Sequence, residues 1–207
     1  MCLNAAVEGS LDEAVVRRVA HSAGFEVSRI LLAQGKGRIL KQIDGYNKSA
    51  RRSPWFVLLD LDRDAGCAPE FIANRLPQRA PYMCFRIAVR EVEAWLLADS
   101  DALAKYLRIS VGQICDQPEL LEQPKNYLVS ITRKSTSPQI KQAIVPRAGS
   151  GRPVGPQYVL MMTQFVEQYW SPERASRRSP SLAGCLRCLR ALREKWDEAV
   201  RTGNIGA

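Results

Sequence analysis

Three apolar segments of this sequence are followed by acidic residues, and these acids are its clearest candidates for chemistry. The segments are 3–7, 55–59 and 82–89, and each is short and apolar enough to form a buried strand. The carboxyl ends of parallel strands gather at one edge of a sheet, where functional groups collect. The candidate acids near these ends are Glu8, Asp12, Asp60, Asp62 and Glu93.

The spacing of Asp60 and Asp62 favours a metal or catalytic site. In an extended chain, residues two apart point to the same side, so both carboxylates can face one cation. Magnesium prefers oxygen ligands, and burying two acids without a cation would raise their pKa values because like charges crowd. The alternative is that these acids cap the following loop, and we expect Asp64 to be a turn or cap residue.

The remaining acids also have structural alternatives. Glu8 precedes a glycine and suits a surface turn, whereas Asp12 suits the N-terminus of a helix. Glu91 and Glu93 do not share a helical face, so at most one of them is expected to point into a site. We favour Glu93, because large apolar residues follow it and predict that it is partly buried.

Scarce residue types exclude several kinds of site. His21 is the only histidine, so a multi-histidine metal site cannot form and any Ser-His-Asp enzyme would have to use this residue. Of the six cysteines, only Cys185 and Cys188 form a Cys-x-x-Cys, and a zinc ribbon needs a second pair. We therefore expect reduced thiols that are mostly buried or incidental to function.

Hydrophobic periodicity predicts alternating strands and helices up to residue 107. This order favours an α/β fold with an open, mainly parallel four-stranded sheet flanked by helices. The predicted strands are 3–7, 25–32, 55–62 and 82–89, and the predicted helices are 12–23, 39–46, 68–76 and 91–107, the last with a break near residues 99–100.

Strands are scarce beyond residue 110, where prolines separate short helices. Two longer helices are predicted at 157–170 and 182–201, and 147–155 is a glycine-rich basic loop. We therefore divide the chain into an α/β core, 1–110, and a basic helical extension, 111–207, that packs on or beside the core.

The net charge of +9 is concentrated in one part of the chain. Residues 1–122 contain 16 Lys and Arg against 16 Asp and Glu, whereas 123–193 contain 12 against 2. Such asymmetry indicates a nucleic acid or another phosphate polymer as partner, although an ordinary solvated surface is the alternative. Lys125, Lys134, Arg147 and Arg152 are the bases expected to hold phosphates or stabilise developing charge.

Several strings resemble a bacterial family of unknown function with a Toprim-like core, akin to the Toprim parts of OLD and RloB-type proteins. The Toprim pattern is a Glu-Gly after the first strand, here Glu8-Gly9, and an Asp-x-Asp after a later one, here Asp60-Leu61-Asp62. The segment 90–99, Arg-Glu-Val-Glu-Ala-Trp-Leu-Leu-Ala-Asp, is the more distinctive marker. Segments 124–126 and 149–156 also resemble the C-terminal part of that family.

The resemblance implies roles for individual residues. Glu8 becomes the general acid or base, and Asp60 and Asp62 become ligands of Mg²⁺ or Mn²⁺. Asp12 matches a further acid of OLD-like nucleases, and Glu93 is implied as a ligand of a second ion. A topoisomerase tyrosine domain or the extra modules of a primase have no room in this chain. The expected activity is therefore that of a nuclease or related phosphodiester-acting enzyme in a bacterial defence or DNA-processing system. Lys125 is expected to take part in catalysis by stabilising developing negative charge.

Two readings from other classes stay open. The chain is alternatively a non-catalytic module with a vestigial metal site that binds nucleic acid or an AAA-type ATPase partner, in a bacterial defence or DNA-processing system. A third reading is an enzyme of a small phosphorylated substrate. The loop 35–37, Gly-Lys-Gly, lacks the Walker spacing and is not expected to bind a nucleotide.

The sequence predicts a cytoplasmic protein without a membrane anchor. It contains no apolar run of membrane-spanning length, and its start lacks the basic region of a signal peptide. The oligomeric state is not predicted.

Overall fold

The computed structural model describes residues 1–62 and 68–205 of the chain. Asp64, predicted as a turn or cap residue, and Cys67 lie outside the described residues. None of the described helices is both long and apolar enough to cross a bilayer.

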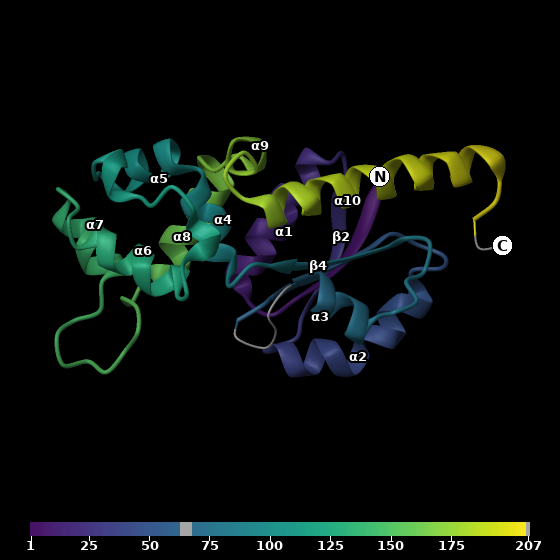
Figure 1. Ribbon diagram of the computed structural model, residues 1–207, viewed down its shortest axis with the longest axis horizontal. Coiled ribbons are helices and arrows are strands. Elements are labelled where there is room, and N and C mark those ends of the chain that lie inside the picture. Colours follow the sequence, from purple (N-terminus) through teal and green to yellow (C-terminus); the bar gives the residue numbers. More distant parts are fainter. Residues whose placement is uncertain (63–67, 206–207) are drawn as a thin grey trace.

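A four-stranded parallel sheet in the order β2-β1-β3-β4 forms the centre of the α/β part, which confirms the predicted fold class (Figure 1). The neighbouring strands β1 and β3 bring the chain segments that follow them to the same edge of the sheet. The strands are β1 (Cys2–Val7), β2 (Glu26–Leu32), β3 (Trp55–Asp60) and β4 (Met83–Ala88).

Helices cover both faces of this sheet and form a second lobe beside it (Figure 1). Helices α6, α7, α9 and α10 each begin with proline, which suits the first turn because its missing N–H would have no partner there. The helices are α1 (Ser10–Ser22), α2 (Lys36–Ser49), α3 (Ala68–Arg75), α4 (Val92–Ala98), α5 (Ser100–Leu107), α6 (Pro124–Thr132), α7 (Pro138–Ile144), α8 (Tyr158–Gln168), α9 (Pro172–Ala175) and α10 (Pro180–Thr202), with short 3-10 turns at Val111–Gln113 and Pro118–Leu120.

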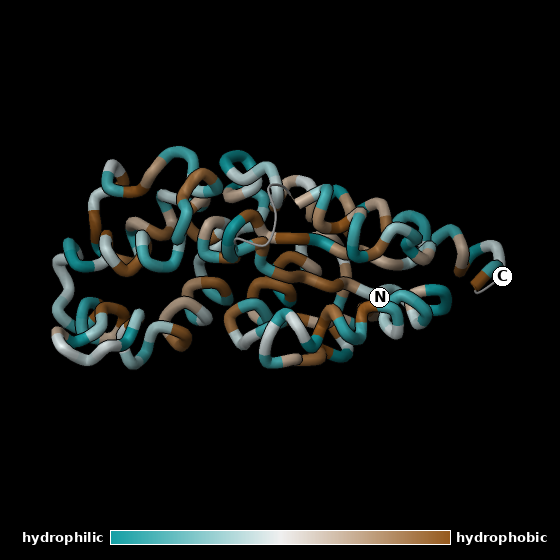
Figure 2. Tube along the Cα trace, turned by 60° about the horizontal axis from the view of Figure 1, so that its bottom comes forward, coloured by the Kyte–Doolittle hydropathy of each residue, from teal (hydrophilic) through white to brown (hydrophobic). Residues whose placement is uncertain are grey.

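The apolar run of β3 is explained by burial on both sides of the sheet. Trp55 and Val57 belong to the core beneath α2 and α3, whereas Phe56 and Leu58 belong to the core beneath α1 and α10. Figure 2 shows this pattern as hydrophobic segments at the centre and hydrophilic ones outside. The second of these cores continues into the helical lobe, where it includes Phe165.

The predicted break in the helix after β4 is confirmed at Asp99, which separates α4 from α5. Asp99 is 3% exposed, and its carboxylate accepts two hydrogen bonds from Arg174 (2.9 and 2.8 Å) and one from the N–H of Ser171 (2.9 Å). A buried carboxylate is stable only when its oxygens are paired in this way. This contact therefore fixes α4 and the acids at its start against the C-terminal helices.

Candidate functional site

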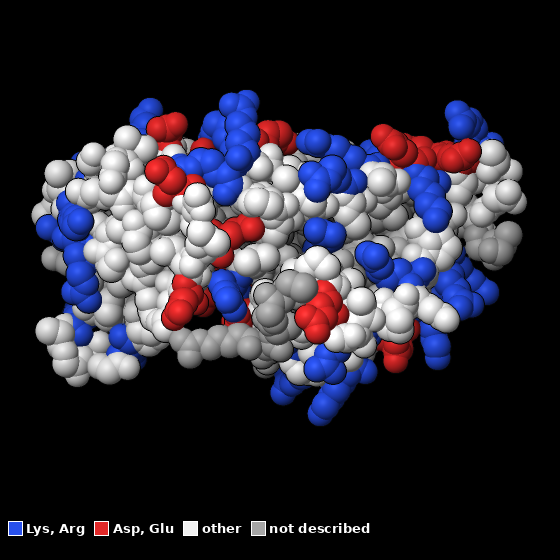
Figure 3. Space-filling model, viewed as in Figure 1, with Lys and Arg blue, Asp and Glu red and all other residues white. Residues whose placement is uncertain are grey.

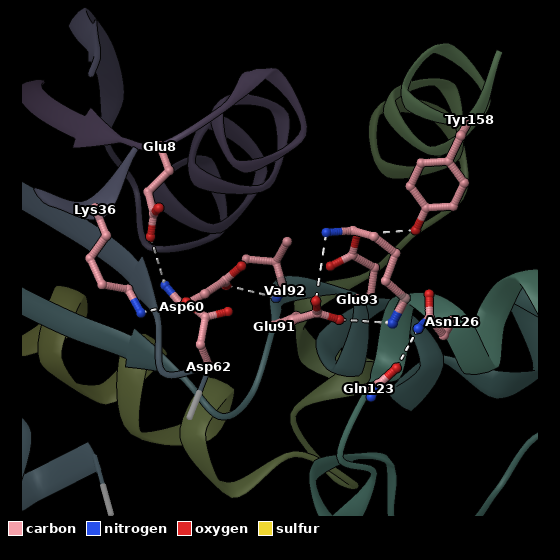
Figure 4. A network of polar contacts seen from close by, with 11 residues as sticks. Glu8, Lys36, Asp60, Asp62, Glu91, Val92, Glu93, Gln123, Asn126 and Tyr158 are labelled. Atoms are coloured by element: carbon pink, nitrogen blue, oxygen red, sulfur yellow. Dashed lines mark hydrogen bonds and ion pairs between the residues drawn. The ribbon is translucent and has the colours of Figure 1, made fainter. Parts of the chain in front are cut away.

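The acids singled out in the sequence line one pocket beyond the carboxyl ends of the strands. Figure 4 shows four of them, Glu8, Asp60, Asp62 and Glu93. The pocket has a volume of about 520 Å³. It receives residues from the segment after β1, the first turn of α1, the end of β3, the start of α4, α6, and the start of α8 with the loop before it. Its charged lining residues are Glu8, Asp12, Asp60, Asp62, Glu91, Glu93 and Lys125.

Backbone hydrogen bonds hold Glu8 and Asp60 in place. Glu8 follows β1, and its Oε1 accepts a hydrogen bond from the N–H of Asp60 at 3.3 Å. Asp60 is the last residue of β3, and its Oδ1 accepts a hydrogen bond from the N–H of Val92 at 2.9 Å. The ends of β1 and β3 and the start of α4 are thus joined through two carboxylates.

Asp12 lies in the first turn of α1 and faces the pocket. Its Oδ2 accepts a hydrogen bond from the N–H of Gly9 at 2.8 Å, so the helix-capping role expected as the alternative is present. The same side chain lines the pocket. Asp12 therefore combines the capping role with a place in the acid cluster.

Asp62 reaches the pocket by a different route from the one predicted. β3 ends at Asp60, and Asp62 has a left-handed backbone with φ 51°. The prediction that an extended backbone aligns the carboxylates of Asp60 and Asp62 is therefore wrong. The Asp62 side chain is 51% exposed, and its Oδ2 lies 2.5 Å from Nζ of Lys36. Its carboxylate joins the rim of the pocket and is neutralised by a lysine at the start of α2.

Glu91 and Glu93 both line the pocket, which corrects the prediction that only one would do so. Glu91 precedes α4 with an extended backbone (φ −144°), so helical spacing does not govern its direction. Its Oε2 accepts a hydrogen bond from the N–H of Lys125 at 2.8 Å, and its Oε1 lies 3.7 Å from Nζ of Lys125.

Glu93 is the most deeply buried acid of the site, with 1% exposure of its side chain. Its Oε1 accepts a hydrogen bond from the hydroxyl of Tyr158 at 3.0 Å and lies 3.4 Å from Nζ of Lys125. Its Oε2 is buried and has no hydrogen-bond partner. A buried carboxylate oxygen without a partner is costly unless a ligand or ion supplies one.

Burial and mutual repulsion raise the pKa values of four acids of the pocket. Burial raises the pKa of Asp12 to about 7, and the charges of Glu93 and Glu8 add to the rise against the Gly9 hydrogen bond. Burial, followed by the charges of Asp12, Glu93 and Glu8, raises the pKa of Asp60 well above its usual range. Burial also raises the pKa values of Glu8 and Glu93.

Lys125 partly neutralises the negative charge of these acids through ion pairs with Glu91 and Glu93. Burial alone would lower the pKa of its ammonium group, but the carboxylates of Glu93, Glu91 and Asp60 outweigh burial and raise the pKa. Lys125 is therefore a fixed cation rather than a proton acceptor. A single lysine cannot balance the whole cluster, so the pocket favours additional positive charge when its acids are ionised.

The donor chemistry of the pocket suits a hard, hydrated cation. Carboxylate oxygens are the ligands that Mg²⁺ and Mn²⁺ prefer, and the unpartnered oxygen of Glu93 adds an available acceptor. Within residues 1–62 and 68–205, no three acidic, cysteine or histidine side chains form a ready metal site. Magnesium usually retains several waters and takes one or two carboxylates, which this arrangement allows.

The three bases predicted to bind nucleic acid lie in the helical lobe. Arg147 and Arg152 are exposed in the loop between α7 and α8 and line a second cavity of about 460 Å³, which shares Val154 with the acid pocket. Lys134 is exposed after α6 and lines neither cavity. Arg147 and Arg152 are thus placed beside the acids, whereas Lys134 is not.

A close approach of the backbone fixes the loop that carries these arginines. The N–H of Gly155 donates a hydrogen bond to the carbonyl of Ile144 at 2.8 Å. A Cβ at this position would lie 2.5 Å from the carbonyl oxygen of Ala143, so a larger residue would force the loop away from α7.

Sequence reasoning missed three lining or neighbouring groups, Lys36, Glu91 and Tyr158. Lys36 belongs to the Gly-Lys-Gly segment, which has no nucleotide-binding spacing, and it meets Asp62 only through the fold. Tyr158 begins α8, 65 residues after its partner Glu93. Only Glu91 carried a usable signal, because it lies directly between the end of β4 and the start of α4.

No protein family, curated protein or solved structure matches this chain. The resemblance to Toprim-like proteins therefore stays a prediction, and the function has to be argued from the pocket.

Proposed function

We propose that this protein is a Toprim-like, magnesium-dependent nuclease or related phosphodiester-acting enzyme. The observation that carries the proposal is the buried cluster of carboxylates at the carboxyl edge of a parallel sheet, with Lys125 inside it and two arginines beside it. Acids that raise one another's pKa values favour a bound cation, and the neighbouring guanidinium groups suit phosphate oxygens.

The residues of the chain have distinct roles in this proposal. A bound Mg²⁺ or Mn²⁺ would activate water and stabilise the charge on a leaving oxygen. Asp60, Asp62, Asp12 and Glu93 are the residues proposed to hold the ion or ions. Glu8 is the proposed general acid or base, because its pKa is raised and its Oε1 is positioned by the backbone of Asp60.

The cationic groups would orient the phosphate. Lys125 keeps its proton and lies in the first turn of α6 beside Glu91 and Glu93, where it can stabilise developing negative charge. Arg147 and Arg152 would hold the neighbouring phosphates of a polymer, and Lys134 would extend this contact. We further propose that the protein acts in a cytoplasmic defence or DNA-processing system with a AAA-type ATPase as its partner. Copurification with such an ATPase would support this.

The test compares cleavage by the wild-type chain with that of Glu8→Gln. Glutamine retains an oxygen that can accept the hydrogen bond from Asp60, so the local structure should persist while proton transfer is lost. We expect Mg²⁺-dependent cleavage of duplex or single-stranded DNA or RNA that EDTA abolishes and that falls about 100-fold or more in Glu8→Gln.

The exposed Glu122→Gln is the matched control, because it makes the same chemical change outside the pocket. It should cleave like the wild type. Equal cleavage by Glu8→Gln would contradict the enzymatic proposal and indicate a contaminating nuclease. Salt-sensitive binding with no cleavage by any variant would favour the non-catalytic module.

A further inference from the structure

A second group of cations lies at the opposite edge of the sheet, in the half of the sequence whose net charge is zero. Lys48, Arg51 and Arg52 line two adjoining cavities of about 630 and 670 Å³, and Arg79 lines the larger one. We call these four residues the basic edge. Asp44 is the only acid that lines either cavity among the described residues.

The basic edge is assembled from two chain segments that are distant in sequence. Lys48 is in the last turn of α2, Arg51 and Arg52 follow that helix, and Arg79 comes from the segment between α3 and β4. A cation near a helix C-terminus is stabilised by the helix dipole, which accounts for Lys48. The dipole does not account for Arg79, which the fold brings in from elsewhere.

Hydrogen bonds and ring packing make this edge a formed surface rather than a set of loose side chains. Asn47 donates from Nδ2 to the carbonyl of Gln78 and accepts from the N–H of Ala80, both at 2.8 Å. Below it, Tyr46 stacks on Trp55 with ring centroids 5.0 Å apart, which joins α2 to the start of β3. The two segments that carry the cations are thereby held together.

Among the described residues, the cations of the basic edge form no ion pairs with the protein's own carboxylates. None of the four forms an ion pair with an acid within residues 1–62 and 68–205. Figure 3 shows Lys and Arg side chains over the part of this face around the end of α2, with few acids among them. Three of the four are arginines, whose planar fork matches phosphate oxygens.

The place of the basic edge separates it from the acid pocket. Arg51 and Arg52 lie just before β3, whereas Asp60 ends that strand. The six residues of β3 span roughly 20 Å, which is close to the rise of about six base pairs of duplex. A small phosphate ester could not touch both edges, but a polymer could contact them together.

We propose that the basic edge binds the phosphate backbone of nucleic acid as a second contact surface, remote from the acid pocket. The binding does not require catalysis, so it goes beyond the proposed activity. Each phosphate neutralised by a side chain releases a counterion, and binding should therefore depend on salt.

The test measures binding of a fluorescent DNA duplex by anisotropy over a range of salt concentrations, in EDTA so that no cleavage occurs. The variant is Arg51→Glu with Arg52→Glu, and both residues are exposed, so folding should persist and is checked by circular dichroism. The control is Lys105→Glu with Lys195→Glu, which makes the same charge change at exposed sites elsewhere.

We expect the basic-edge variant to bind about 10-fold or more weaker than the control and to lower the slope of log affinity against log salt by about 2. Equal binding by the two variants would overturn the proposal. Displacement of the duplex by polyglutamate as readily as by unlabelled duplex would also overturn it, because the surface would then recognise negative charge alone. The cleavage assay is a separate test. If the wild type cleaved no nucleic acid but the basic-edge variant still bound duplex more weakly than the control, only the enzymatic proposal would be refuted.

Discussion

The two edges of the sheet carry opposite charges in opposite environments. At the carboxyl edge, acids are crowded and largely buried, and repulsion raises the pKa values of Asp12 and Asp60. At the amino edge, the cations of the basic edge surround open cavities and lack ion pairs among the described residues. Burial makes charge costly and ties the acid pocket to stability, whereas exposure leaves the cations free to affect binding with little effect on folding.

Removing the lysine of the acid pocket should have the largest effect on stability. Lys125→Met leaves Glu93 and Glu91 without their ion pairs, and we expect the free energy of unfolding to fall by about 2 to 3 kcal/mol. The loss is smaller than for a fully buried pair, because the Lys125 side chain is 38% exposed. Urea unfolding at neutral pH measures it.

The double variant Lys125→Met with Glu93→Gln serves as the control for that loss. It removes the stranded charge and should recover part of the stability. No difference between the single and double variants would contradict the electrostatic explanation.

Magnesium should stabilise the acid edge and leave the basic edge unaffected. At about 100 times its dissociation constant, a ligand adds about 2.7 kcal/mol, which corresponds to a rise in Tm of roughly 5–10 °C for a chain of this size. We expect this rise at pH 8 and a much smaller one at pH 5, because protonated carboxylates bind metal poorly. Thermal unfolding with Mg²⁺ or EDTA measures it, and an equal rise in Asp60→Asn would contradict a site at Asp60.

Without metal, stability should fall as the pH rises from about 4 to about 7. The folded state keeps a proton on Asp12, whose pKa is raised to about 7, at pH values where the unfolded chain has released it. Folding is therefore favoured at the acidic end of this window and loses that contribution as the pH passes the folded pKa. Urea unfolding should show this fall in stability, and Asp12→Asn should flatten the profile.

The smallest effect on stability should come from a change at the basic edge, where neutral hydrogen bonds of Asn47 hold the two segments together. Asn47→Ala removes two hydrogen bonds to the segment at residues 78–80, and we expect a loss of about 1 kcal/mol in stability. Duplex binding should weaken severalfold because Arg79 is no longer held beside Arg51. A wild-type affinity in this variant would show that the connection between the two segments does not matter for binding.

The sequence predicted the acid edge better than the basic edge, for a physical reason. Glu8 and Asp60 follow apolar runs, and parallel strands bring such ends together whatever the details of the loops. The same reasoning was wrong about the backbone of Asp62, because a left-handed residue changes the direction of a side chain without altering the apolar pattern.

The contacts that sequence reasoning missed depend on tertiary folding. Lys36 meets Asp62, and Tyr158 meets Glu93, across separations of 26 and 65 residues. The basic edge was hidden because the acids of the first 122 residues cancel its charge in any count along the chain. Only the fold shows that the acids collect at one end of the sheet and these bases at the other.

The most direct test of the account is Mg²⁺-dependent cleavage by Asp60→Asn beside the wild type and Asp101→Asn. Asparagine keeps the oxygen that accepts the Val92 hydrogen bond, so this change removes charge with little change of shape, and Asp101 is an exposed acid on α5. The account predicts cleavage by the wild type and Asp101→Asn and a rate about 100-fold or more lower for Asp60→Asn. Equal cleavage by all three, or no cleavage by the wild type on any nucleic acid with Mg²⁺ or Mn²⁺, would contradict it.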